Sequence, residues 1–207
     1  MKYPSVKNIK KYPENIYFID RNILDLKLLN LASTILYKGG IIIFPTETVY
    51  GIGVNASKKD ACNKLYQLKN RPLNKPLSYH FDSLDSFFKF SGKGIDKKQK
   101  LWFKKWIPNP VTLIYFDSNL NKKIGVRITE DLIAKNILKN ANCPVFATSV
   151  NFSLEKAAIR ISDINKKLIN KVDMVIDAGK TKNSKESTVI DISDNNPVIL
   201  RHGAFKL

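Results

Sequence analysis

The stretch that decides the fold is Gly39-Gly40-Ile41-Ile42-Ile43-Phe44-Pro45-Thr46-Glu47-Thr48-Val49-Tyr50-Gly51-Ile52-Gly53. Its β-branched and aromatic run, Ile41–Phe44, is closed by Pro45 and predicts a strand buried on both faces. Val49–Val54 predicts the next strand. The polar residues between the two strands would then lie at the edge of a sheet, which is where α/β proteins commonly place a ligand.

Helical spacing flanks this stretch on both sides. Asp25–Tyr37 carries apolar residues at intervals of three and four, and Gly39-Gly40 supplies a C-terminal stop. Downstream, Ser57 predicts the N-cap of a helix that runs to Leu68 and ends before Pro72. A helix, a strand, a second strand and a second helix therefore follow one another.

The rest of the chain alternates in the same way. Further strands are predicted at Leu77–Phe81, Val111–Phe116, Ile124–Ile128, Val145–Val150, Met174–Ala178, Thr188–Ile192 and Val198–Leu200. Further helices are predicted at Leu84–Phe88, Asp96–Trp106, Asp131–Lys139 and Ser162–Asn170, and a loop at Ser91–Lys100. We expect residues 1–24 to be a polar lead-in with a strand at Ile16–Ile19. Residues 25–207 would form one α/β domain with a twisted mixed sheet of seven strands or more.

Composition narrows the class of protein. The 207 residues are 43% hydrophobic and 10% aromatic, which is enough for a packed core. No apolar run approaches the roughly 20 residues that span a bilayer, and no secretory signal is evident near the N-terminus. Cys62 and Cys143 fit neither a disulfide framework nor a thiolate zinc site. We therefore expect a globular protein of the cytoplasm.

The charge of the chain is strongly positive. Lys and Arg number 35 against 18 Asp and Glu, a net charge of +17, which favours anionic partners such as nucleotides, RNA or acidic lipid headgroups. Lysine is also abundant in products of AT-rich coding sequences, so many lysines could be merely solvated. Arginine is scarcer, and its planar fork of donors suits carboxylates and phosphates. We take Arg71, Arg127 and Arg201 as site candidates, and Arg21 and Arg160 as surface cations.

Generic catalytic motifs are incomplete or missing. Gly51–Ala56 matches the loose G-x-G-x-x-A dinucleotide pattern, but Lys69 and Arg71 stand where an acidic residue should follow, so we interpret the segment as a turn. The sequence contains no G-x-x-x-x-G-K-[ST] phosphate loop, and its two histidines form no zinc motif. Ser149 lacks the G-x-S-x-G context, so no Ser-His-Asp hydrolase is predicted.

The polar segments at the predicted strand ends, taken in order, resemble one family. Gly39–Gly53 closely resembles the signature of the YrdC-like threonylcarbamoyl-AMP synthases. From about residue 25 to the C-terminus, the resemblance continues through Lys69-x-Arg71-Pro72 with Pro76-Leu77, Gly125-Val126-Arg127, Ser149-x-Asn151, Ser187-Thr188-Val189-Ile190-Asp191 and Leu200-Arg201-x-Gly203. No single triplet identifies the family, but the order and spacing of the triplets together are specific to it. The chain stops where the short, single-domain form of the family stops.

The resemblance implies a YrdC-like α/β domain with helices around a basic cleft, and an enzyme. L-threonine and bicarbonate or CO2 would give N-carboxythreonine, whose carbamate attacks the α-phosphate of ATP to form threonylcarbamoyl-AMP and pyrophosphate. The product would supply t6A modification of tRNA through a downstream threonylcarbamoyl transferase complex. ATP is then a substrate, Mg²⁺ accompanies it without a dedicated protein cage, and no membrane partner is implied.

The resemblance also implies roles for individual residues. Those that would bind threonine are Thr48, His80, Arg127, Ala147 and Ser187. Those that would bind ATP are Lys69, Arg71, Lys75, Ser149, Asn151 and Arg201, with Lys69 and Arg71 also catalytic. Arg127 would hold the threonine carboxylate through a two-pronged salt bridge. His80 could equally be a satisfied strand histidine and Lys75 a solvent lysine, and no residue is evident as a general base.

The sequence departs from the family pattern at several positions. Asn109 stands where members usually have the Gly of G-P-L-T, Leu154 replaces the Gly of the S-A-N-x-S-G stretch, and Glu186 replaces the Pro that commonly precedes S-T-V. These changes bear on the shape of the nucleotide side.

Two other functions fit the same composition. A non-catalytic domain could cradle double-stranded RNA or tRNA by charge and shape alone, and it would not need Arg127 in particular. A carbamoyl-transfer module acting on carbamoyl phosphate is the third candidate, although the partner domains of such enzymes are not evident in this sequence.

Overall fold

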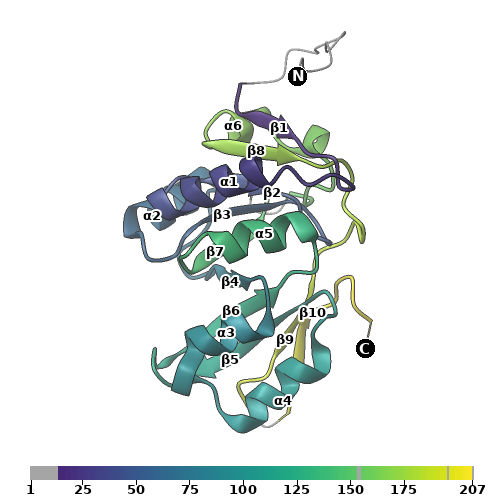
Figure 1. The fold of residues 1–207 in the computed structure, drawn as a ribbon. Helices are drawn as coiled ribbons and strands as arrows, with labels where there is room; N and C mark the ends of the chain where they lie inside the picture. Colours follow the sequence, from purple (N-terminus) through teal and green to yellow (C-terminus); the bar gives the residue numbers. More distant parts are fainter. Residues whose placement is uncertain (1–13, 153–154, 195, 207) are drawn as a thin grey trace.

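In the computed structural model, ten strands of the described residues, 14–152, 155–194 and 196–206, form one mixed sheet. The strands are β1 (Ile16–Phe18), β2 (Ile42–Phe44), β3 (Gly51–Asn55), β4 (Ser78–Phe81), β5 (Val111–Asp117), β6 (Lys122–Ile128), β7 (Val145–Ser149), β8 (Met174–Asp177), β9 (Thr188–Asp191) and β10 (Val198–Arg201). Their order across the sheet is β1-β8-β2-β3-β7-β4-β6-β5-β9-β10 (Figure 1). The predicted fold class is confirmed, and each predicted strand has a counterpart.

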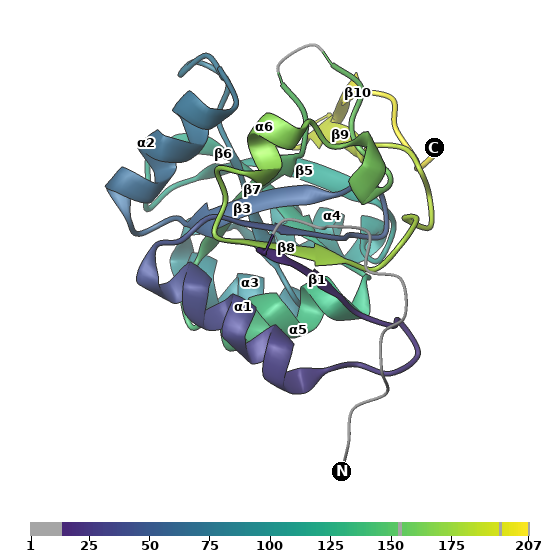
Figure 2. The same cartoon turned by 90° about the horizontal axis from the view of Figure 1, so that it is seen from above.

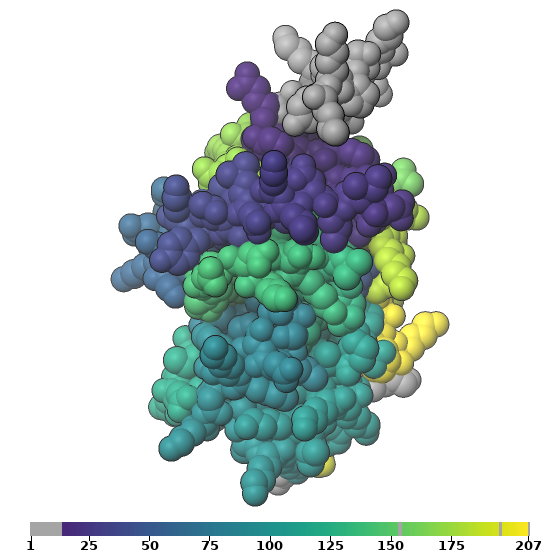
Figure 3. Space-filling model, viewed as in Figure 1, coloured from purple at the N-terminus to yellow at the C-terminus, as the bar shows by residue number. Residues whose placement is uncertain are grey.

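Helices cover both faces of the first half of the sheet. The helices of the described residues are α1 (Leu26–Lys38), α2 (Lys59–Leu68), α3 (Leu84–Ser91), α4 (Lys97–Trp106), α5 (Leu132–Asn140) and α6 (Lys166–Ile169), with 3-10 turns at Gly92–Gly94 and Ile161–Asp163. In Figure 2, α1 and α5 lie on one side of the sheet and α2 and α6 on the other. Figure 3 shows the outer surface of the first side, where α1 and α5 lie next to each other.

Buried apolar side chains fix these helices to the sheet. Leu36 of α1 and Ile137 of α5 join one buried cluster, while Leu65 of α2 and Leu168 of α6 join another. Fully burying a side chain of this size contributes about 1.5–3 kcal/mol relative to leaving it exposed. The α1 helix starts at the N-cap Asp25, as the apolar spacing predicted.

The connection that follows β2 is fixed by close strand packing. β2 and β3 pair antiparallel and leave Pro45–Tyr50 as the link between them.

Gly53 lies within β3, so the turn predicted from the G-x-G-x-x-A pattern is wrong. A Cβ on Gly53 would lie 2.9 Å from Cε1 of Phe44 and 3.2 Å from the carbonyl oxygen of Phe146. Glycine is needed here because neighbouring groups approach closely.

The second half of the sheet is covered by α3 and α4 on one face only. Alternate residues of a strand point to opposite faces. Leu113, Tyr115 and Val126 therefore pack in the cluster beneath α3 and α4. Thr112 and Arg127 point the other way and line a pocket. The alternation of β5 and β6 thus produces a core on one side and a polar site on the other.

The start of α2 differs from the prediction. Ser57 is not the N-cap, because its backbone N–H donates to Oδ1 of Asn55 at 2.9 Å. The cap position passes to Lys58, which forms no side-chain capping bond. A local turn closed by the asparagine side chain has displaced the helix start.

Two further segments differ from the prediction. The helix predicted over residues 162–170 is interrupted at Asn165, whose side chain accepts a hydrogen bond from the backbone N–H of Lys167 at 2.9 Å and starts α6 afresh. The loop predicted over residues 91–100 contains a 3-10 turn and the first turn of α4.

The N-terminal segment is tied to the sheet. β1 pairs in parallel with β8, within the range predicted as a lead-in. Arg21, predicted to be a surface cation, donates from Nε to the carbonyl oxygen of Ala178 at 3.0 Å and pairs with Asp131, the N-cap of α5. The prediction that Arg21 is a surface cation is wrong.

The start of the lead-in, residues 1–13, and Leu154 lie outside the described residues. None of the helices described is long and apolar enough to cross a membrane.

Candidate active site

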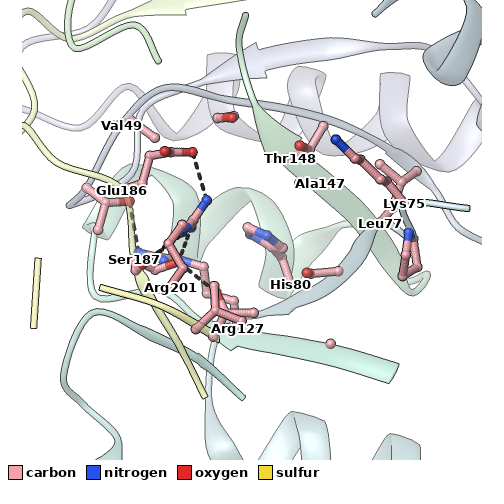
Figure 4. A pocket seen from close by; sticks show the side chains of 18 of the residues that line it. Val49, Lys75, Leu77, His80, Arg127, Ala147, Thr148, Glu186, Ser187 and Arg201 are labelled. Atoms are coloured by element: carbon pink, nitrogen blue, oxygen red, sulfur yellow. Dashed lines mark hydrogen bonds and ion pairs between the residues drawn. The ribbon is translucent and has the colours of Figure 1, made fainter. Parts of the chain in front are cut away.

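The uncovered face of β4, β6 and β5 carries a pocket of about 910 Å³. All the residues predicted to bind threonine or ATP line it: Thr48, Lys69, Arg71, Lys75, His80, Arg127, Ala147, Ser149, Asn151, Ser187 and Arg201. In Figure 4, Ser187 and Arg201 lie on one side, Lys75 on the other, and His80 and Arg127 between them. The structure brings these residues together, while the ligand that each one binds stays a prediction.

Arg127 is a buried cation at the floor of the pocket, and its residue is 4% exposed. One terminal nitrogen, Nη2, donates to a carboxylate oxygen of Glu47 and, at 2.9 Å, to Oγ1 of Thr48. The Nε atom is buried and has no hydrogen-bond partner among the described residues. Because an unsatisfied buried donor is costly, this nitrogen is a ready contact for an incoming acceptor.

The turn that presents Thr48 is braced by its own side chains and by a distant segment. Oγ1 of Thr46 donates to the carbonyl oxygen of Val49 at 2.7 Å and lies 2.9 Å from Oγ1 of Thr48. The hydroxyl of Thr181 donates to the carbonyl oxygen of Thr48 at 2.8 Å. The polar residues that follow β2 are therefore held in place before any ligand arrives.

His80 lies on β4 opposite Arg127 on β6 and is buried. Its Nδ1 atom has no hydrogen-bond partner among the described residues. Burial, reinforced by the charge of Arg127, lowers the pKa of His80 to about 3. The imidazole is therefore neutral at physiological pH and offers hydrogen bonds without charge.

Lys69 is a second buried cation, at the C-terminal end of α2. Its Nζ donates to the carbonyl oxygen of Ser149 and, at 3.3 Å, to Oγ1 of Thr148. Both acceptors are neutral. Burial, together with the nearby charge of Arg71, lowers the pKa of Lys69 to about 7. This ammonium group would gain most from a negatively charged ligand.

Arg71 and Lys75 stand beside Lys69 at the mouth of the pocket. Arg71 donates from Nε to the carbonyl oxygen of Lys75 at 2.8 Å and from Nη2 to that of Pro76 at 2.9 Å. These bonds fold the 71–76 loop around the guanidinium group. Lys75 is exposed but lines the pocket, so its position fits a solvent lysine as well as a phosphate contact.

The last strand brings Arg201 to the opposite wall. Its Nη2 atom donates to the carbonyl oxygen of Ser187 at 2.9 Å, and Nη1 pairs with Glu186 at 3.1 Å. The Ser187 hydroxyl lies 2.8 Å from that of Thr112. A Cβ on Gly203 would lie 2.2 Å from the carbonyl carbon of Ser187, so only glycine lets the chain pass there. Glu186, which stands where the sequence resemblance led us to expect a proline, thus places a carboxylate beside Arg201.

Several pocket residues were not singled out from the sequence. Thr46, which lines the pocket, and Glu47, which lies behind it, belong to the quoted stretch, and their position after a strand could have identified them. Thr112 also lines the pocket. Its position near the start of a predicted strand could have identified it too, although less clearly. Lys123, paired with Asp191 at 3.0 Å, is one lysine among many, and nothing in the sequence marks it.

The family model of the Sua5/YciO/YrdC proteins, described as "Telomere recombination", matches residues 34–203 and so spans the pocket described above. The chain belongs to this family. A threonylcarbamoyl-AMP synthase of Psychromonas ingrahamii is 32% identical over 161 residues, which cover 72% of this chain and 84% of that protein. One of Pyrococcus abyssi is 29% identical over 187 residues, covering 86% of this chain and 55% of that protein.

A solved structure supports the family assignment. P. abyssi Sua5 complexed with L-threonine has a TM-score of 0.83 to this chain at 28% identity, covering 91% of this chain and 57% of that one. This Sua5/YciO/YrdC chain thus spans little more than half of either Pyrococcus protein. The family resemblance seen in the sequence is confirmed.

Proposed function

We propose that this protein is a threonylcarbamoyl-AMP synthase that converts L-threonine, bicarbonate or CO2 and ATP into threonylcarbamoyl-AMP and pyrophosphate. The observation that carries the proposal is one pocket with two unlike ends. One end is formed by a neutral histidine and a buried arginine whose Nε has no hydrogen-bond partner among the described residues. The other end is formed by Lys69, Arg71 and Lys75, which pair with no carboxylate of the described residues. The names of the relatives from Psychromonas and Pyrococcus support the same reaction.

The first end suits a small amino acid. Arg127 would bind the threonine carboxylate, because Nε is buried and unsatisfied. Thr48, His80 and Ser187 supply polar groups that can meet a substrate hydroxyl, and Ala147 leaves room for the side chain. A site built to hydrogen-bond a hydroxyl rejects analogues that lack it, because its own polar groups would stay unpaired.

The second end suits a triphosphate. Lys69, Arg71 and Lys75 would gather the phosphates and stabilise the charge that develops at the α-phosphate during adenylyl transfer. Ser149 and Asn151 are joined by a 2.7 Å hydrogen bond and would contact the nucleotide, as would Arg201 from the opposite wall. Holding the carbamate and the α-phosphate next to each other supplies much of the catalysis, and a water-poor pocket protects the labile carbamate.

No group of three or more His, Cys, Asp or Glu side chains that could hold a metal occurs in the described part of the chain, so Mg²⁺ would arrive on the phosphates of ATP. The product would pass to a tRNA threonylcarbamoyl transferase complex in the cytoplasm for t6A synthesis. The net charge of +17 would also attract tRNA or double-stranded RNA directly.

Release of pyrophosphate tests the proposed reaction. Purified protein with ATP and bicarbonate is expected to release pyrophosphate only when L-threonine is added, since the carbamate of threonine is the nucleophile. L-serine, which lacks the methyl group, serves as the matched substrate control and is expected to be poorer. If threonine gives no increase, while RNA binds tightly and with strong salt dependence, the non-catalytic RNA-binding function replaces this one.

The proton balance of ATP binding provides a second test. With a pKa of about 7, Lys69 is mostly neutral in the empty pocket at pH 8. Phosphates favour the ammonium form and raise its pKa, so ATP binding at pH 8 is expected to take up a proton. Calorimetry in two buffers of different ionisation enthalpy measures this uptake. Equal enthalpies in both buffers, or an uptake that persists in Lys69→Met, would contradict the assignment.

A further inference from the structure

Charge is balanced differently at the two ends of the pocket. In the described ranges, Lys69, Arg71 and Lys75 form no ion pair with a carboxylate, and the side chains of Lys69 and Arg71 donate to neutral oxygens. The cation at the threonine end, Arg127, is instead paired with Glu47. His80 beside it is neutral because burial depresses its pKa. The part of the pocket around Lys69, Arg71 and Lys75 is therefore cationic, and the part around Arg127 is charge-balanced, while Arg201 on the other wall pairs with Glu186.

Glu47 is placed behind Arg127 and not in the pocket itself. It does not belong to the pocket lining, and its residue is 7% exposed. One carboxylate oxygen accepts from Arg127, and the other accepts from the hydroxyl of Thr129 at 2.8 Å and the backbone N–H of Glu130 at 3.2 Å. Burial alone would raise the pKa of Glu47, but Arg127 and these donors lower it below its usual value. The carboxylate is therefore held ionised, and both of its oxygens accept hydrogen bonds.

We propose that Glu47 is a specificity-determining residue, which makes the threonine end select a zwitterionic amino acid over a purely anionic acid by cancelling the charge of Arg127. The inference rests on the proposed function, because it concerns the same substrate. An uncompensated buried guanidinium would attract any carboxylate or phosphate and repel the ammonium group of threonine. With Glu47 in place, Arg127 still offers its free Nε as a hydrogen-bond donor, but the end as a whole does not favour anions.

The pair also separates the two substrates. Phosphate groups are drawn to Lys69 and Arg71, which have no carboxylate partner in the described part of the chain, and gain little at the balanced end. Specificity of this kind is a difference between two binding affinities, and it is achieved here by weakening the binding of the wrong ligand. Glu47 therefore influences which ligand binds at the threonine end, and it does not contact the reacting atoms.

The test compares two ligands that differ only in the amino group. L-threonine and (R)-3-hydroxybutanoate share the carboxylate, the hydroxyl and the methyl group, and calorimetry gives both affinities. The unaltered protein is expected to prefer threonine by about tenfold or more, a difference of about 1.4 kcal/mol. In Glu47→Gln this preference is expected to fall by about tenfold, because the nearby charge changes by one unit. Glu47→Asp keeps the charge, and its preference should stay within about threefold.

Glu130→Gln is the matched control, since it removes a neighbouring carboxylate that pairs with Lys135 and not with Arg127. It is expected to keep the preference of the unaltered protein. A merely structural role for Glu47 would weaken both ligands by the same factor, and an unchanged preference in folded Glu47→Gln overturns the inference. If that variant does not fold, equal affinities of the two ligands for the unaltered protein overturn it as well. Absence of threonine binding to the unaltered protein would instead overturn the proposed function.

Discussion

Replacing Lys69 by methionine is expected to lower the rate of pyrophosphate formation by about 10²–10³-fold, or about 2.7–4 kcal/mol, the range found when one preorganised charge-stabilising donor is removed from an active site. Lys69 is buried among neutral acceptors, so its ammonium group is poorly compensated until phosphates arrive. Methionine has a similar length and removes only the charge and its hydrogen bonds. The measurement is the steady-state rate at saturating threonine and ATP.

Stability separates this effect from a folding defect. Since burying a charged amine is costly, Lys69→Met is expected to unfold at a temperature no lower than that of the unaltered protein. Lys64→Met, on the exposed face of the same helix, is the matched control and is expected to keep full activity. A Lys69→Met enzyme with normal turnover would remove this residue from the catalytic group.

Replacing Arg127 by lysine is expected to weaken threonine binding by about 1–3 kcal/mol, because the charge remains while the planar fork is lost. The ammonium group of lysine would lie near Glu47 but could not reproduce the free Nε donor. Calorimetric titration with L-threonine measures the loss. ATP affinity in the absence of threonine should stay the same, since the phosphates are assigned to the other end of the pocket.

Arg160→Lys provides the control for this exchange, because Arg160 is exposed and does not line the pocket. An unchanged threonine titration in Arg127→Lys would show that the carboxylate binds elsewhere. A parallel loss of ATP affinity would indicate that the variant disturbs the whole pocket and not the amino-acid end alone.

The strands could be predicted because their signal is local. Ile41–Phe44 is a continuous apolar run, and Thr188–Ile192 and Val111–Phe116 have β-branched residues bounded by polar ones, so each predicts its own strand without knowledge of its neighbours. Grouping the site was possible because the polar segments follow strand ends. The family resemblance supplied the ligand assignments, which periodicity could not.

Partner choice could not be predicted, because it depends on contacts far apart in the chain. Arg127 and Glu47 are separated by 80 positions, and Arg21 and Asp131 by 110. Nothing near Arg21 distinguishes it from a solvated cation. The pKa of Lys69 likewise depends on burial in the folded protein, where its Nζ donates to the carbonyl oxygen of Ser149, 80 positions away.

Local predictions failed where a short polar side chain had two possible uses. Ser57 has the composition of an N-cap, but Asn55 closes a turn around it first. Asn165 interrupts a segment whose apolar spacing alone favours one helix. In Gly51–Ala56, glycine meets a packing need within a strand, although the same pattern elsewhere makes a turn.

The sheet order has a mechanical consequence for the molecule. β7 and β4 join the half of the sheet that contains β2 and β3 to the half that contains β6, β5, β9 and β10. Thr48 and Lys69 approach the pocket from the first half, Ser149 from the end of β7 at the junction, and Arg127 and Arg201 from the second half. A molecule that touches both ends of the pocket would therefore bridge the two halves of a single continuous sheet.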